Sequence, residues 1–191
     1  MTVFPQPPKL EPVANTGGGE IRRLTEDHAT YIYLPFGRSL EIIVKAGYET
    51  DGASVPSLES ILSDLKMSKD FAKLLNKHFS CEIDINTIFK WLVGNPWDMP
   101  RLLAAVVHDG LYGRKWKCRW LCDLVYRLIL MQTSYDAFRR EIEYDAIRLF
   151  GWRNWNAVTK EERLKTKSLV SIRIVKTKQI PELAGISEEE N

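Results

Sequence analysis

The apolar residues of the chain follow two different spacings, and each predicts its own kind of structure. Residues 40–46 alternate between apolar and polar positions, and residues 29–34 are rich in β-forming side chains. Residues 35–38, Pro-Phe-Gly-Arg, carry turn-forming residues between the two segments. This pattern predicts a β-hairpin. Residues 169–175 alternate again and predict a late strand that returns to the same sheet.

Residues 100–131, PRLLAAVVHDGLYGRKWKCRWLCDLVYRLILM, have the apolar spacing of helices. Gly113 and the basic residues after it interrupt the pattern, so we expect two antiparallel helices joined by a tight turn. His108 and Asp123 are equally distant in sequence from the middle of that turn. Antiparallel pairing therefore predicts that the imidazole faces the carboxylate.

A third long helix is predicted over residues 135–150, capped by Ser134 and ended by Gly151. Its expected buried face is apolar and consists of Phe138, Ile142, Ala146 and Leu149. The charged residues expected in water are Arg139, Arg140, Glu141, Glu143 and Arg148. Trp152 and Trp155 follow in a predicted short connector. Earlier, residues 57–94 predict two or three short helices, and Asp98 is the expected cap of the helix that begins near Pro100.

These elements predict an α+β fold, in which a small N-terminal antiparallel β-sheet packs on a helical layer that contains the central helical hairpin. Residues 1–20 are rich in Pro and Gly and are expected to form an extended arm. Residues 21–178 are expected to form a single domain, with a helical insertion at 57–99, and residues 179–191 an acidic tail. A chain of 191 residues is long enough to bury a sizeable core.

Composition and charge argue against several function classes. The net charge of +2 argues against nucleic acid as a partner, although Arg114 to Trp120 interleaves basic and aromatic residues. No apolar run reaches about 18 residues, so no membrane span is expected. The N-terminus lacks the pattern of a signal peptide. Cys118 and Cys122, two of three cysteines, are one helical turn apart and are expected to stay reduced, as in a cytosolic compartment.

The candidate chemistry centres on His108. Asp123 would fix the tautomer of the imidazole and leave the other nitrogen free to act on water, or the pair would be a buried packing device. Asp51, Asp109 and His108 could instead bind a divalent metal. Oxygen ligands suit Ca²⁺ or Mg²⁺, and the imidazole suits Zn²⁺ or Mn²⁺. Alternatively, Asp51 makes a local turn bond to the backbone.

Four spaced motifs occur in order along the chain. TDGASVP at 50–56 is followed by AAVVHDGLYG at 104–113, by Asp123, and by EYDAIRLFGW at 143–152. Over roughly residues 21–152 this set resembles the phage and prophage proteins catalogued as domain of unknown function 1353. The region 57–99 is longer than the linker typical of that family. The resemblance implies a phage context, in the host cytoplasm or the virion, but no reaction.

The local pattern H-D-x-x-Y, with C-D on the next helix, is similar to the catalytic helix pair of phospholipase A2. That resemblance implies that His108 activates water, Asp109 holds Ca²⁺, Asp123 orients the imidazole and Tyr112 supports the site. The disulfides and the Gly-rich calcium loop of the secreted enzymes are missing. The Asp51-Gly52 turn is the candidate replacement for the loop.

Two functions are therefore expected. The first is a phage-encoded hydrolase-like protein of unknown substrate, in which His108 is the general base and Asp109 and Asp51 bind a metal or position water. The second is a non-catalytic virion or assembly protein, tail- or neck-associated, in which the His-Asp cluster is structural. Its partners would be other phage structural proteins or further copies of the chain.

Overall fold

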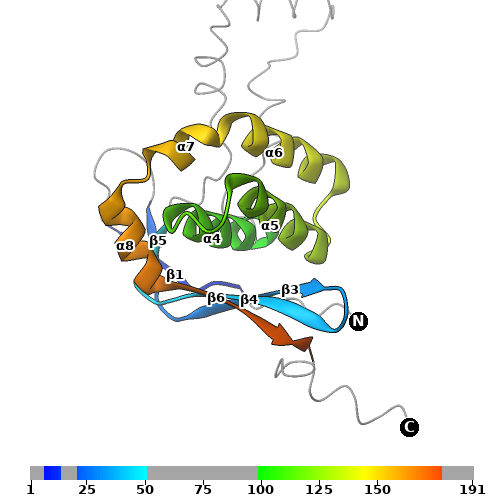
Figure 1. Ribbon diagram of the computed structural model, residues 1–191, viewed down its shortest axis with the longest axis horizontal. Coiled ribbons are helices and arrows are strands. Elements are labelled where there is room, and N and C mark those ends of the chain that lie inside the picture. Colours follow the sequence, from blue (N-terminus) through cyan, green and yellow to red (C-terminus); the bar gives the residue numbers. More distant parts are fainter. Residues whose placement is uncertain (1–6, 14–20, 51–98, 178–191) are drawn as a thin grey trace, which may run out of the picture.

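The computed structural model describes residues 7–13, 21–50 and 99–177. Three layers follow one another in Figure 1: a β-sheet, the helices α4 and α5, and the helices α6 and α7 on the far side. The predicted α+β fold is confirmed, with two small antiparallel sheets rather than one. The helices predicted over 57–94, the cap at Asp98 and the tail at 179–191 lie outside the described residues.

The sheet beneath the helices has the strand order β3-β4-β6. Strands β3 (His28–Leu34) and β4 (Arg38–Val44) form the predicted hairpin, whose turn carries Phe36 and Gly37, both at φ 64°. The late strand β6 (Val170–Lys176) pairs antiparallel with β4, as predicted. Leu40, Ile42 and Val44 of β4 are buried, because alternate residues of a strand point to one face.

The second sheet has the order β1-β2-β5 and consists of very short strands. Strand β1 (Leu10–Pro12) belongs to the predicted N-terminal arm and is extended, but it pairs with β2 (Arg22–Leu24) of the same chain. Strand β5 (Glu49–Thr50) pairs with the other edge of β2. Because of this pairing, Thr50 is held at one end of the helical layer.

The predicted helical hairpin is confirmed as α4 (Met99–Gly113) and α5 (Arg119–Gln132). Helix α4 is buried along most of its length between the sheet and the outer helices. Large apolar side chains such as Leu111 and Ile129 are almost completely buried, and each contributes about 1.5–3 kcal/mol to folding. Cys118 and Cys122 are both free thiols.

Helix α6 (Ala137–Phe150) begins two residues later than predicted, and its cap is Asp136 instead of Ser134. The Asp136 carboxylate accepts a hydrogen bond of 2.9 Å from the backbone N–H of Arg139. Ser134 has a φ of 56°, so it lies in the left-handed region and turns the chain before the helix starts. Both Ser134 and Asp136 have side chains able to cap a helix. The backbone conformation at Ser134 therefore decides that Asp136 is the cap.

The predicted apolar face of α6 is only partly correct, because Ala146 packs against the core and Ile142 is half-buried. Phe138 is 62% exposed and Leu149 is 66% exposed, whereas Glu143 and Ile147 are completely buried. The Glu143 carboxylate accepts hydrogen bonds from the hydroxyls of Tyr126 (2.6 Å) and Tyr135 (2.8 Å). Because these two hydroxyls are available inside the protein, Glu143 faces the interior. Helix α6 is therefore rotated away from the orientation that hydropathy alone predicts.

The connector predicted after Gly151 is helical. Helix α7 (Trp152–Ala157) is followed by α8 (Lys160–Leu169), which leads directly into β6. A reciprocal pair of hydrogen bonds between Thr159 and Glu162 caps α8. None of the described helices is long and apolar enough to cross a membrane.

Candidate functional site

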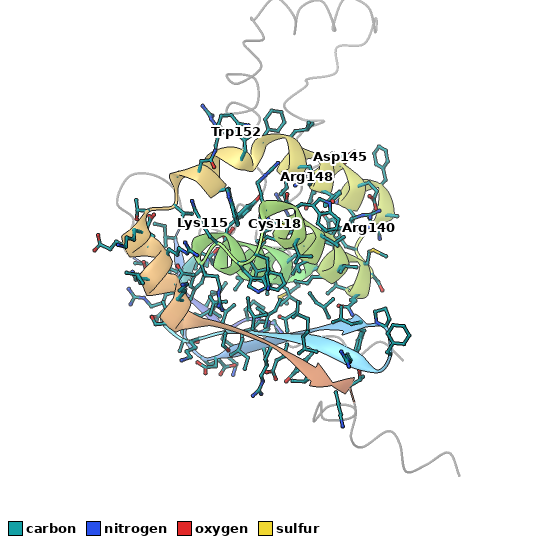
Figure 2. All side chains as sticks on the ribbon, in the orientation of Figure 1. Lys115, Cys118, Arg140, Asp145, Arg148 and Trp152 are labelled. Carbon is teal, nitrogen blue, oxygen red and sulfur yellow. The ribbon has the colours of Figure 1, made fainter. Side chains whose placement is uncertain are left out.

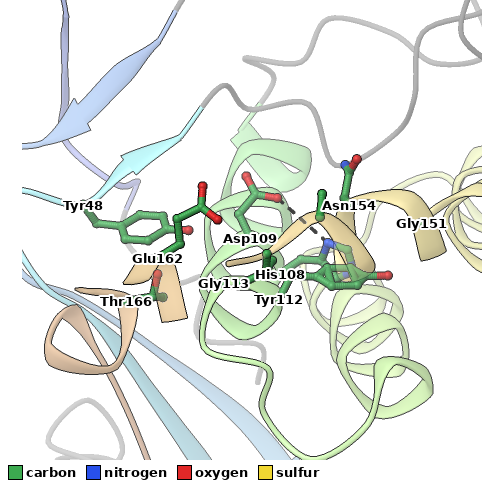
Figure 3. Close-up of a pocket in the computed structure, with 11 residues that line it drawn as sticks. Tyr48, His108, Asp109, Tyr112, Gly113, Gly151, Asn154, Glu162 and Thr166 are labelled. Atoms are coloured by element: carbon green, nitrogen blue, oxygen red, sulfur yellow. Dashed lines mark ion pairs between the residues drawn. The ribbon is translucent and has the colours of Figure 1, made fainter. Parts of the chain in front are cut away.

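A cavity of about 440 Å³ opens beside the His108 end of the helical hairpin (Figure 3). Its walls come from α4, from the junction of α6 and α7, from α8, and from Tyr48 just before β5. Helix α4 contributes His108, Asp109 and Tyr112, and the C-terminal helices contribute Asn154, Glu162 and Thr166. The cavity is of the size that binds small ligands in proteins.

The predicted pairing of His108 with Asp123 is present. Nε2 of His108 lies 3.1 Å from Oδ1 of Asp123, and both side chains are buried. The His108 ring also makes edge-to-face contacts with Tyr112 (ring centroids 4.1 Å apart) and Tyr126 (5.4 Å). The Asp123 carboxylate and the two tyrosine rings together hold the imidazole in one orientation.

The Asp123 carboxylate of α5 accepts hydrogen bonds from donors on two other helices, α4 and α6. Besides His108 of α4, the Tyr112 hydroxyl donates to Oδ1 (2.5 Å) and Nη1 of Arg148 donates to Oδ2 (2.6 Å). Burial alone would raise the pKa of Asp123, but the hydrogen bonds from His108, Tyr112 and Arg148 lower it below its usual value. Asp123 is therefore an ionised, acceptor-only group at neutral pH.

Arg148 was expected in water, and this prediction is wrong. The residue lies between α6 and the hairpin (Figure 2), where its guanidinium pairs with the buried Asp123. Arg119 lies nearby and donates to the backbone carbonyls of Ile147 (3.2 Å) and Arg148 (2.9 Å). The sequence offered one signal, since Arg148 belongs to the motif EYDAIRLFGW, but helical amphipathicity pointed the other way.

Tyr112 supports the site as a neutral hydrogen-bond donor. Burial, and then the neighbouring carboxylate of Asp123, raise the pKa of Tyr112 well above its usual value. The phenol therefore keeps its proton, which it donates to Asp123. Trp155 of α7 packs against the Tyr112 ring with centroids 5.2 Å apart, and this contact connects α7 to the site.

The second ring nitrogen of His108 faces a different environment. Nδ1 is buried and has no hydrogen-bond partner among the described residues. Since Nε2 faces an ionised acceptor, Nε2 carries the hydrogen in the neutral ring and Nδ1 presents a lone pair. A buried acceptor without a partner costs about 1–3 kcal/mol. Ligand binding in the cavity that His108 lines would recover part of this cost.

Asp109 is an acidic group close to that nitrogen, with Oδ1 4.0 Å from Nδ1 of His108. Its other oxygen, Oδ2, accepts a hydrogen bond of 2.7 Å from the Thr50 hydroxyl. Thr50 is the first residue of the motif TDGASVP. Hydrogen bonds therefore connect residues of all four sequence motifs to His108 and Asp109, which line the cavity.

The predicted metal ligands are Asp51, Asp109 and His108, of which Asp51 lies outside the described residues. Within the ranges that the structure describes, no three His, Cys, Asp or Glu residues group closely enough to hold a metal ion. The described donors alone do not fit a metal centre, and the three-residue set stays a prediction.

The wall formed by α7 and α8, which supplies Asn154, Glu162 and Thr166, was not predicted from the sequence. A signal was present, because Thr159 followed three residues later by Glu162 is the pattern of a capping box and marks the start of a helix. No sequence pattern shows that this helix returns to the His108 end of the hairpin.

Searches with protein-family models, among curated proteins and among solved structures found no match to this chain. The resemblances to the phage family and to the phospholipase A2 helix pair therefore stay predictions. The functional argument depends on the geometry of the site.

Proposed function

We propose that the protein is a hydrolase in which His108 activates a water molecule as a general base. The observation that carries this proposal is the state of the two ring nitrogens. Nε2 is held by the buried carboxylate of Asp123, and Nδ1 lies at a cavity wall with no partner among the described residues. An oriented imidazole with one basic nitrogen next to a cavity is the arrangement that general-base catalysis requires.

In the proposed reaction, a water molecule in the cavity donates a hydrogen bond to Nδ1. As its oxygen attacks the electrophilic carbon or phosphorus of the substrate, one proton passes to Nδ1 and the imidazole becomes a cation. The ionised Asp123 stabilises that cation through the hydrogen bond to Nε2. Nδ1 then returns the proton to the leaving group. General-base catalysis of this kind contributes roughly 10²–10⁴-fold to a rate.

The remaining residues hold the base in place. Tyr112 and Arg148 donate to the same carboxylate and so fix the position of Asp123. Asp109, held by Thr50, lies on the other side of the ring, where its carboxylate can accept the second hydrogen of the attacking water. The roles of His108, Asp123 and Tyr112 agree with those that the resemblance to phospholipase A2 implies, whereas Asp109 orients water here instead of holding Ca²⁺.

A second candidate function is that of a non-catalytic phage virion or assembly protein. Its support is the saturation of Asp123 by donors from α4 and α6, which ties three helices together regardless of any chemistry. The phage context of either function follows from the family resemblance alone.

The two functions predict different behaviour of a His108→Gln variant. The purified protein is assayed with chromogenic carboxylic esters, anilides and phosphate diesters, and its melting temperature is measured in parallel. For the hydrolase we expect at least about a 100-fold loss of kcat in His108→Gln. His28→Gln is the matched control at pH 7.5, because His28 is also buried but does not line the cavity.

The hydrolase proposal is wrong if the wild-type protein hydrolyses none of the three substrate classes, or if His108→Gln keeps the wild-type rate. The structural function predicts instead that His108→Gln loses about 1–3 kcal/mol of stability, the cost of leaving buried partners unpaired. Recovery of the chain in stoichiometric amounts from purified virions would favour that function directly.

A further inference from the structure

The charges of the cavity indicate which substrates it accepts. Two of the described lining residues, Asp109 and Glu162, are acidic, and no described lining residue is a lysine or an arginine. Hydrogen bonds from the backbone and hydroxyl of Thr159 lower the pKa of Glu162, so this carboxylate is ionised at neutral pH. A cavity lined by one sign of charge attracts ligands of the opposite sign.

Glu162 both caps the start of α8 and lines the cavity. Its Oε2 accepts the capping hydrogen bonds from Thr159, at 2.8 Å from the backbone nitrogen and 3.0 Å from the hydroxyl. Figure 3 shows the Glu162 side chain in the same part of the cavity wall as Asp109 and the Tyr48 ring. Carboxylates combined with an aromatic ring are the groups with which proteins bind organic cations.

An acidic wall alone does not make a binding site, but this cavity has a second feature. Nδ1 of His108, whose side chain is 2% exposed, lies at the same wall with no partner among the residues that the structure describes. We propose that the cavity binds a substrate that carries a compact organic cation, such as an ammonium group, with the cation held by Glu162 and Asp109 and the scissile bond next to His108. This inference rests on the proposed hydrolase function and names its substrate class.

The geometry favours an organic cation over a metal ion. The carboxylates of Asp109 and Glu162 already accept hydrogen bonds from Thr50 and Thr159, and no three-residue ligand group forms within the described ranges. An organic ammonium group needs only nearby carboxylates and an aromatic surface, without a fixed coordination geometry.

The first test measures binding and does not depend on turnover. Butyltrimethylammonium chloride and sodium butanesulfonate are titrated into the full-length protein by NMR at equal ionic strength. We expect saturable binding of the cation, no binding of the anion, and about 2–5-fold weaker cation binding in Glu162→Gln. Glutamine keeps the capping pattern of α8, because a capping box accepts Glu or Gln at this position.

Glu161→Gln is the matched control, because it removes the same charge from the neighbouring residue of α8, which does not line the cavity. Cation binding should stay at the wild-type level in this variant. Equal binding of cation and anion, or an equal effect of the two variants, would overturn the proposal. So would displacement of the cation by stoichiometric Ca²⁺ or Mg²⁺, which would identify a metal site.

The second test compares two 4-nitrophenyl esters that differ in charge but not in shape, 4-(trimethylammonio)butanoate and 5,5-dimethylhexanoate. We expect a higher kcat/KM for the cationic ester and a loss of that preference in Glu162→Gln. If both esters are hydrolysed equally in a His108-dependent reaction, the substrate class is wrong and the hydrolase function stands. If the cation binds but no hydrolysis depends on His108, the hydrolase function is wrong and the cation site stands.

Discussion

The Tyr112 hydroxyl occupies the space that a side chain at position 151 would need. A Cβ atom built on Gly151 would lie 2.6 Å from the Tyr112 hydroxyl oxygen and 2.6 Å from the carbonyl oxygen of Ile147. The same hydroxyl donates the 2.5 Å hydrogen bond to Asp123. Gly151→Ala should therefore push Tyr112 out of the site.

Three contributions determine the change in folding stability that we expect for Gly151→Ala. Loss of a hydrogen bond to a buried charged group costs about 1.5–3 kcal/mol. Crowding against the Ile147 carbonyl adds about 1 kcal/mol. Replacing glycine at a helical φ of −61° returns about 0.5–1 kcal/mol by restricting the unfolded chain. We expect a net loss of about 2 kcal/mol, which lowers the melting temperature by roughly 4–8 °C.

A double-mutant cycle isolates the clash with the hydroxyl. Stability is measured by urea unfolding for the wild type, Gly151→Ala, Tyr112→Phe and the double variant. Because phenylalanine lacks the hydroxyl, Gly151→Ala should cost at least about 1 kcal/mol less in the Tyr112→Phe background. Gly110→Ala is the control: a Cβ there would meet Val170 at 3.0 Å, so its effect should add to that of Tyr112→Phe.

Additivity of the two substitutions within about 0.5 kcal/mol, the usual error of such comparisons, would show that the Tyr112 hydroxyl does not clash with a side chain at position 151. Gly151 would then be required only for the backbone at the junction of α6 and α7. A hydrolase in which Tyr112 positions Asp123 also predicts that both single variants lower kcat more than they raise KM.

Two further predictions concern the dependence of stability on pH. Burial lowers the pKa of His28 below 6.5, so its contribution is present above that unfolded value and is lost as the pH falls through the folded pKa. His28→Gln should therefore flatten the loss of stability below pH 6.5 in urea titrations, and an unchanged slope would refute this cause. Burial raises the pKa of Glu143 above 4.5, so its contribution is lost as the pH rises through the folded value. Relative to the wild type, Glu143→Gln should gain stability between pH 4.5 and 7.5, whereas a constant difference would contradict the argument.

Local patterns determined the parts of this fold whose partners are near in sequence. Alternation over residues 40–46 and a four-residue turn were sufficient for the β3–β4 hairpin. Helical spacing on both sides of the basic turn was sufficient for α4 and α5, and it brought His108 to 3.1 Å from Asp123. These predictions held because hairpin geometry sets which residues face each other once the turn is known.

Long-range packing decided the rest. Arg148 and Glu143 were predicted in water because charged residues of an amphipathic helix usually face solvent, but Asp123, Tyr126 and Tyr135 supply buried partners for them. A buried polar group takes whatever orientation satisfies its hydrogen bonds, even when this exposes Phe138 and Leu149.

The sequence by itself thus determined the α+β class, the two hairpins and the pairing of imidazole with carboxylate, since each depends on spacing along one short stretch. Only the tertiary structure decided that α7 and α8 enclose a cavity at the His108 end of the hairpin, that Glu162 and Asp109 share its wall, and that Nδ1 of His108 has no partner among the described residues. The physical reason is that a cavity is the space left between elements, which depends on the packing of side chains distant in the sequence.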